Sequence, residues 1–159
     1  MSSVLMEQCM AAASATGAFT PDELDVLREV LTEWSVHPDG NYRLLTEERD
    51  GAAVAFLIYG PTPMTAFAYD LYWIAVDPAH QKKGLGAHLE RRMCALLLKG
   101  AKRAVLRVET AGRDEYAGQR FFYLACGYTE CGRIPNFYSE GDDLVFYCKE
   151  IGEGTEQGT

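Results

Sequence analysis

The sequence lacks the features of a membrane-spanning chain and of a broad nucleic-acid binder. It has no run of about 18 or more apolar residues, so we expect no membrane helix. Its N-terminus lacks a basic region followed by an apolar core, so we expect no secretory signal and a cytoplasmic protein. Fifteen lysines and arginines face 23 aspartates and glutamates, and the formal net charge of −8 argues against a nucleic-acid partner, which needs a basic surface.

Cysteine and histidine are too scattered to predict a disulfide framework or a metal site. The five cysteines are odd in number and form no C-x-x-C motif, which fits a reducing compartment. Two of the three histidines, His80 and His88, flank a glycine-rich stretch, but no carboxylate or thiol lies at ligand spacing with them. The sequence therefore predicts no bound metal.

The composition is that of a folded chain with one sizeable core. With 159 residues and 48% hydrophobic residues, we expect a single domain over 1–151 and a disordered tail over 152–159. Hydrophobic periodicity and turn residues predict an α/β fold with a mixed sheet of six to seven strands and helices on both faces. Helices are predicted at 4–14, 21–34, 85 to a C-cap at Gly100, and 116–125, and strands at 41–47, 52–59, 69–76, 104–110, 128–133 and 144–150.

The stretch from Tyr69 to Leu98 carries the main functional signal. An apolar strand ends before Pro78, a loop with two lysines and two glycines follows, and a helical pattern starts at Leu85. Such a loop presents free N–H groups at a helix N-terminus, and Gly84 and Gly86 let a phosphate approach the backbone. We interpret it as a pyrophosphate cradle. On the glycines alone, a turn before an ordinary amphipathic helix is an equal alternative.

The loop in its context resembles a known family. Q-K-K-G-L-G-A after I-A-V-D-P resembles the Q/R-x-x-G-x-G/A signature of the GNAT superfamily of N-acetyltransferases. The resemblance covers roughly 20–150 and implies the GNAT fold, with a first strand that is reduced or absent. It also implies acetyl-CoA as co-substrate and an amine as acceptor. The cofactor site is then assigned to Ile74, Ala75, Val76, Gln81, Lys82, Lys83, Gly84, Leu85, Gly86, Ala87, Tyr116 and Phe122.

The catalytic candidates are a tyrosine and two acids. F-F-Y-L-A-C-G-Y resembles the family's motif of a tyrosine, three residues, a glycine and an aromatic, which implies Tyr123 as general acid toward the departing thiolate. A buried tyrosine with a satisfied hydroxyl is the alternative. Asp70 lies where the histone acetyltransferase branch has its catalytic glutamate, one methylene shorter here. Glu109 on the next parallel strand is the rival base, and a structural hydrogen bond or a solvated strand end is the alternative for both.

Three classes of function compete. The first is direct acetyl transfer from acetyl-CoA to an amine, without a covalent intermediate, because Cys126 has no evident histidine to activate it. The second is a catalytically silent module that binds acyl-CoA and regulates. The third, a dinucleotide-binding oxidoreductase, needs a third glycine where Leu89 stands. The sequence does not identify the acceptor, and apolar strands near the C-terminus make a homodimer plausible.

Overall fold

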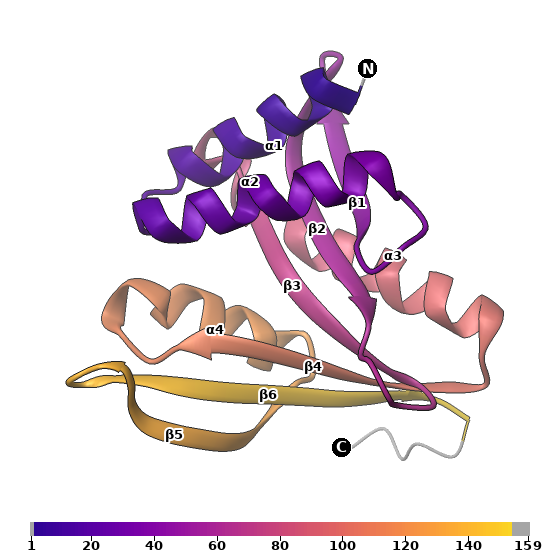
Figure 1. Ribbon diagram of the computed structural model, residues 1–159, viewed down its shortest axis with the longest axis vertical. Helices are drawn as coiled ribbons and strands as arrows, with labels where there is room; N and C mark the ends of the chain where they lie inside the picture. The colour runs from indigo at the N-terminus through magenta and orange to yellow at the C-terminus, as the bar shows by residue number, and fades with distance from the viewer. Residues whose placement is uncertain (1, 154–159) are drawn as a thin grey trace. The chain divides into compact units, whose positions relative to one another are not determined.

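The computed structural model describes residues 2–153 of the chain and contains alternating helices and strands (Figure 1). The helices are α1 (Ser2–Ala15), α2 (Pro21–Val36), α3 (Leu85–Gly100) and α4 (Ala117–Ala125), with the 3-10 helices η1 (Pro78–His80) and η2 (Asp114–Tyr116). The strands are β1 (Arg43–Arg49), β2 (Ala52–Pro61), β3 (Ala68–Val76), β4 (Arg103–Ala111), β5 (Thr129–Ser139) and β6 (Asp142–Gly152).

The six strands form one mixed sheet in the order β1-β2-β3-β4-β6-β5. Strand β3 pairs with β4 in parallel over Ala68–Asp70, and α3 makes the crossover between them. The β1–β2, β4–β6 and β5–β6 pairs are antiparallel. The prediction of a mixed α/β sheet with six to seven strands is thereby confirmed, and the sheet has six.

The chain divides into two compact units. The first contains residues up to Gly60 and Tyr72–Met93, and the second contains Pro61–Leu71 and the chain from Cys94 onward. The division falls inside β3 and inside α3. The single domain therefore stays a prediction, and each unit is described below by itself.

The first unit is built around α1 and α2, which lie side by side (Figure 1). Leu27 and Leu31 of α2 are fully buried, as is Cys9 of α1, and they pack with Phe56 and Ile58 of β2. The spacing of these apolar residues along α2 places them on one helical face. This core fixes the strands that lead into the glycine-rich loop.

In the second unit, β4, β6 and β5 lie side by side, and α4 follows β4 in the chain (Figure 1). Tyr123 of α4 contacts Tyr128 and Tyr147, with ring centroids 5.7 and 6.0 Å apart. All three tyrosines are buried. This aromatic cluster joins the helix to one face of the β4–β6–β5 sheet.

Some element boundaries predicted from the sequence need correction. Strand β5 continues to Ser139 instead of ending near 133, and Pro135 is tolerated because β5 is the last strand of the sheet and needs no donor on its open side. Strand β1 begins at Arg43 and not at 41, and Gly100 is the last residue of α3 and not its cap. The tail predicted to be disordered was expected to begin at residue 152, but Gly152 is the last residue of β6. From residue 154 on, the tail lies outside the described residues. Between residues 2 and 153, no helix is long and apolar enough to cross a membrane.

Candidate active site

An exposed glycine-rich loop leads into the start of α3. Residues 81–84 are all exposed, and Lys82 and Gly84 have positive φ angles of 63° and 77°. The N–H of His88 donates to the carbonyl of Gly84 at 3.0 Å, which is the first turn's helical hydrogen bond. The amides of Leu85, Gly86 and Ala87 precede it and have no acceptor within the helix. Their N–H groups and the helix dipole make this end of α3 attractive to an anion.

Helix α2 shows what a self-satisfied start looks like. Its cap residue Thr20 accepts a hydrogen bond from the N–H of Glu23 at 3.2 Å, and the Glu23 carboxylate accepts one from the N–H of Thr20 at 3.3 Å. Helix α3 has no acidic residue in its first turn, and Gly84 stands where a capping side chain would be. The difference fits a helix start that takes its anion from a ligand.

Side chains brace the loop against the end of β3. The Gln81 amide donates to the carbonyl of Val76 at 3.0 Å, and the Asp77 carboxylate accepts from the N–H of Ala79 at 2.9 Å. The N–H of Asp77 donates to the carbonyl of Val54 at 2.8 Å. Gln81 was predicted only as a cofactor residue. Its bracing contact was missed because the sequence does not show where the strand carbonyl points.

The strand residues assigned to the cofactor are part of the first unit's core. Ile74 and Ala75 are buried, and Val76 is half-buried. Because the side chains of Ile74 and Ala75 are buried, a ligand would contact these residues through their backbone groups, and their cofactor role stays a prediction.

Asp70 of β3 is held by an ion pair in the second unit. Its carboxylate accepts hydrogen bonds from Arg107 Nε at 2.7 Å, from Arg107 Nη2 at 3.2 Å and from the Thr62 hydroxyl at 2.7 Å. The carboxyl group is 9% exposed and the guanidinium 44% exposed. Because its carboxylate already accepts three hydrogen bonds, Asp70 has few lone pairs left to accept a proton from an amine. Asp70 as base stays a prediction, and these contacts favour its structural alternative.

We expect Asp70→Asn to lower the free energy of unfolding by about 1–3 kcal/mol, because the mutation leaves the guanidinium without its charged partner. Denaturant unfolding measures this. The matched control is Glu150→Gln, whose ion pair with Arg103 is exposed at both ends and should change stability by less than about 1 kcal/mol. Equal losses in the two variants would show that the Asp70 pair is no stronger than a surface pair.

Tyr123 lies inside the aromatic cluster of the second unit. Its side chain is 3% exposed, and Phe122 contacts it edge-on at a centroid distance of 5.5 Å. Burial, and secondarily the nearby Cys126 thiol, raise the pKa of Tyr123 above its ordinary value. The phenol therefore remains a proton donor throughout the neutral and moderately alkaline range.

Tyr116, the other tyrosine assigned to the cofactor, is also buried. The Arg113 guanidinium lies over its ring at 4.4 Å and pairs with the Asp142 carboxylate at 3.3 Å. The Arg120 guanidinium donates to the carbonyls of Ala111 and Arg113, both at 2.9 Å. These contacts hold the segment between β4 and α4 in one conformation. Sequence analysis missed Arg113 and Arg120, whose partners are backbone carbonyls and a distant acid.

Glu109 and Thr110 of β4 have polar side-chain groups without a partner among the described residues. Glu109 is exposed, and its carboxylate has no ion pair or hydrogen bond within residues 2–153. Thr110 is 4% exposed, and its hydroxyl is a buried polar atom with no hydrogen-bond partner in the described part of the chain. A buried hydroxyl without a partner is costly, and a ligand could satisfy it.

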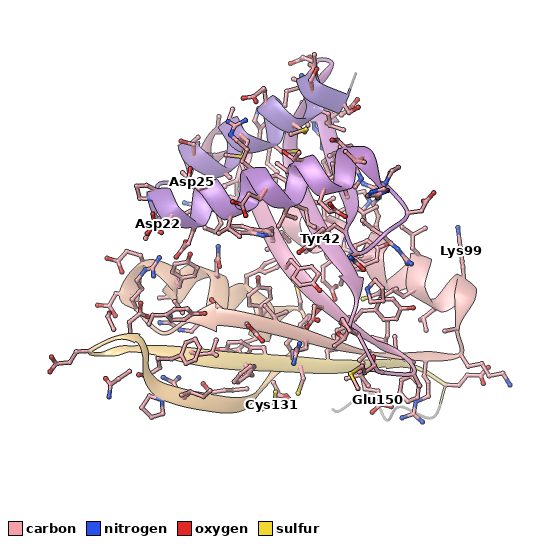
Figure 2. The ribbon with its side chains drawn as sticks, in the orientation of Figure 1. Asp22, Asp25, Tyr42, Lys99, Cys131 and Glu150 are labelled. Atoms are coloured by element: carbon pink, nitrogen blue, oxygen red, sulfur yellow. The ribbon has the colours of Figure 1, made fainter. Side chains whose placement is uncertain are left out.

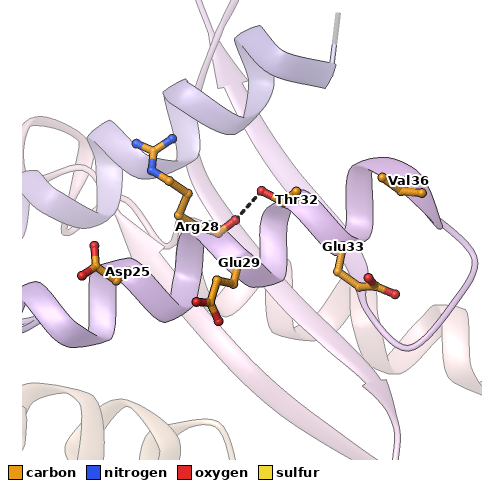
Figure 3. A pocket seen from close by; sticks show the side chains of 6 residues that line it. All are labelled: Asp25, Arg28, Glu29, Thr32, Glu33 and Val36. Atoms are coloured by element: carbon orange, nitrogen blue, oxygen red, sulfur yellow. Dashed lines mark hydrogen bonds between the residues drawn. The ribbon is translucent and has the colours of Figure 1, made fainter.

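A shallow groove of the first unit lies elsewhere, along α2 (Figure 3). Its lining residues belong to this one helix, and none of them is a predicted site residue; they are Asp25, Arg28, Glu29, Thr32, Glu33 and Val36. Arg28 is engaged by Glu7 of α1 at 2.7 Å. Because one helix face forms it, the groove carries no catalytic assignment.

The predicted site residues divide between the two units. The loop and strand residues 74–76 and 81–87 belong to the first, while Asp70, Glu109, Tyr116, Phe122 and Tyr123 belong to the second. Within the second unit, Tyr123 and Phe122 are in contact, and Asp70 binds Arg107 on the neighbouring strand.

A family model for the acetyltransferase (GNAT) domain matches residues 40–130, which span β1 to the start of β5. The chain belongs to the GNAT acetyltransferase family. Membership makes the protein an acyltransferase, and it confirms the family resemblance that the sequence motifs indicated. The match includes the glycine-rich loop, Tyr123 and both candidate bases.

Solved structures agree with this family. A GNAT-family protein from Desulfovibrio desulfuricans is 35% identical, with a TM-score of 0.84, and the match covers 91% of each chain. An aminoglycoside 6'-N-acetyltransferase complexed with coenzyme A is 14% identical, with a TM-score of 0.70 over 96% of this GNAT chain and 94% of that one. The ribosomal-protein-S18-alanine N-acetyltransferase from Escherichia coli is 23% identical, with a TM-score of 0.64 over 81% of each chain. At these identities the last two show the fold alone.

No curated protein matches this GNAT chain. Within residues 2–153, no group of three or more histidine, cysteine, aspartate or glutamate side chains is placed to hold a metal ion.

Proposed function

We propose that this GNAT protein transfers the acetyl group of acetyl-CoA directly to a primary amine of a small molecule or a protein. The observation that carries the proposal is the start of α3, which follows an exposed loop with two left-handed residues and has neither a capping side chain nor an acid of its own. The five cysteines are free, which fits a cytoplasmic enzyme.

The residues of the first unit fit the pyrophosphate of coenzyme A. The amides of Leu85, Gly86 and Ala87 would bind its oxygens, and the exposed Lys82 and Lys83 would add positive charge. The coenzyme supplies the activated acetyl thioester when bound. In the second unit, the unpartnered hydroxyl of Thr110 is a further group that a ligand could satisfy.

Tyr123 would protonate the sulfur that leaves. Its raised pKa keeps the proton on the phenol at neutral pH, and its burial excludes water that would compete for that proton. Phe122 packs against its ring and limits the orientations that it can take.

Glu109 is the better candidate for the base that accepts the amine proton. Its carboxylate is exposed and has no ion pair or hydrogen bond among the described residues, whereas the Asp70 carboxylate forms an ion pair with Arg107. Val108, one residue earlier, pairs with Tyr147, which contacts Tyr123. Because successive strand residues face opposite sides, Glu109 faces away from Tyr123, so it would take the amine proton through a water and not by direct contact.

We expect Glu109→Gln to lower kcat about 10- to 100-fold at neutral pH, with part of the loss recovered at high pH, where more of the amine is already deprotonated. Steady-state kinetics across the pH range measure this, with Asp70→Asn as the paired variant. If Asp70→Asn shows this pattern and Glu109→Gln keeps the full rate, the base is Asp70.

The chemistry of the acceptor is the open part of the proposal. Two aromatic pairs of the first unit, Phe19 with Trp73 and Tyr42 with Tyr72, each have ring centroids 5.2 Å apart and are candidates to line an acceptor pocket. The net charge of −8 suits a cationic amine. The related structures named for aminoglycoside and ribosomal-protein acetylation are acetyltransferases of a small molecule and of a protein.

The test is thiol release from acetyl-CoA with a panel of aminoglycosides, polyamines, amino acids and peptides, followed by the mass of each product. We expect the amine product to be heavier by about 42 Da, which is the mass added when one acetyl group replaces one hydrogen. Tight binding of coenzyme A without release for any amine would overturn the transfer reaction and leave a binding module.

A further inference from the structure

Two cysteines meet on the sheet of the second unit. Cys131 is the extra residue of a β-bulge in β5, where Glu130 pairs with Tyr147 and Gly132 pairs with Phe146. Cys148 lies on β6 opposite Thr129, two residues before Cys131. The two residues are therefore diagonal neighbours across antiparallel strands.

Their thiols lie close to each other. The Cys131 thiol donates to the carbonyl of Phe146, two residues before Cys148 on β6, at 3.6 Å, and the Cys148 thiol is near enough to raise the pKa of Cys131. Rotation of the two side chains, with a local shift of the bulge, would bring the sulfur atoms to bonding distance. The bulge supplies that freedom, because its extra residue is not held by the ladder.

One member of this cysteine pair, Cys131, is the exposed thiol of the described residues, whereas Cys148 is half-buried, as are Cys94 and Cys126. Cys148 alternates with Tyr147, whose ring packs on Tyr123, so the pair lies on the opposite face of the sheet from the aromatic cluster. Cys131 is exposed (Figure 2), while Cys9 is fully buried. Burial also raises the pKa of the Cys9 thiol to about 12, which keeps it protonated and unreactive.

We propose that Cys131 and Cys148 are a modification site, at which a peroxide converts the two thiols reversibly into a disulfide that joins β5 to β6. The Cys131 sulfur attacks one peroxide oxygen, the O–O bond breaks, and a sulfenic acid and water form when the oxidant is hydrogen peroxide. The Cys148 sulfur then displaces that oxygen, an S–S bond forms, and a second water leaves. The two thiols lose two electrons, which reduce the peroxide.

The reaction is slow at neutral pH. Burial, followed by the Cys148 thiol, raises the pKa of Cys131 to about 11, so little of the reactive thiolate is present. The site therefore responds to sustained peroxide and not to brief exposure. The product closes a loop from 131 to 148 and restricts the unfolded chain.

The experiment exposes the folded, reduced protein to hydrogen peroxide, blocks the remaining thiols with an alkylating agent and maps the peptides without reduction. We expect one linked pair, Cys131 with Cys148, and the loss of two of the five thiols. We also expect Tm to rise by about 5 °C or more in the oxidised protein, and dithiothreitol to reverse the rise.

Three variants separate this site from general oxidation. Cys131→Ser and Cys148→Ser should abolish the peroxide-dependent rise in Tm, while Cys126→Ser should keep it in full. In Cys148→Ser, Cys131 should remain as a sulfenic acid that dimedone traps. The proposal is overturned if Cys131 and Cys148 stay reduced under these conditions, if Cys131 is oxidised beyond the disulfide in the wild-type chain, or if it links two chains.

Discussion

Replacing Tyr123 by phenylalanine is expected to lower kcat about 10- to 1000-fold while the affinity for acetyl-CoA changes little. The variant removes the phenol and keeps the ring that packs on Tyr128 and Tyr147, so the fold should survive. A thiolate is a moderately good leaving group, so protonation accelerates its departure without being indispensable. A steady-state assay of thiol release gives kcat, and calorimetry gives the affinity for acetyl-CoA.

The matched control is Tyr147→Phe, which removes a second phenol from the same aromatic cluster and should leave kcat within about threefold. A pH profile adds an independent readout. Because burial raises the pKa of Tyr123, deprotonation of this acid should cause no fall in kcat between pH 7 and about pH 10. A Tyr123→Phe enzyme as fast as the wild type would refute the acid role.

Local patterns were enough to predict most elements of this fold. Apolar residues of α3 recur every four positions at Leu85, Leu89, Met93 and Leu97, and all four are buried. The capping box at Thr20 and Glu23 is a local signal for the start of α2 that needs no tertiary contact. These signals lie within one or two turns of chain, so the sequence alone displays them.

The parts that sequence analysis missed depend on contacts between distant residues. Asp70 pairs with Arg107, which lies 37 positions later in the sequence, and only the parallel pairing of β3 and β4 brings the two residues opposite each other. The length of β5 was underestimated because Pro135 signals a break unless the strand is known to lie at the edge of the sheet. Ion pairs and strand order depend on tertiary structure, and the hydrophobic periodicity of the sequence does not predict them.

Replacing Gly86 by valine is expected to raise the Kd of coenzyme A about 100-fold or more. Gly86 is the second residue of α3, within the turn whose amides have no helical acceptor. A branched side chain there would keep phosphate oxygens away from these N–H groups. Each lost hydrogen bond to a charged oxygen costs about 1.5–3 kcal/mol, and 1.4 kcal/mol is a tenfold change in Kd. Isothermal titration calorimetry with coenzyme A measures the result directly.

Gly118 offers a control at the corresponding position of another helix. It is the second residue of α4, and a Cβ added there would meet nothing within 4 Å. Gly118→Val and Gly86→Val therefore make the same change in the first turn of a helix, with the same effect on helix propensity. Only Gly86→Val lies next to the loop of residues 81–84. We expect Gly118→Val to bind coenzyme A within about threefold of the wild type, since it removes no amide from the cradle. If folded Gly86→Val binds as tightly as Gly118→Val, the start of α3 is not the phosphate site.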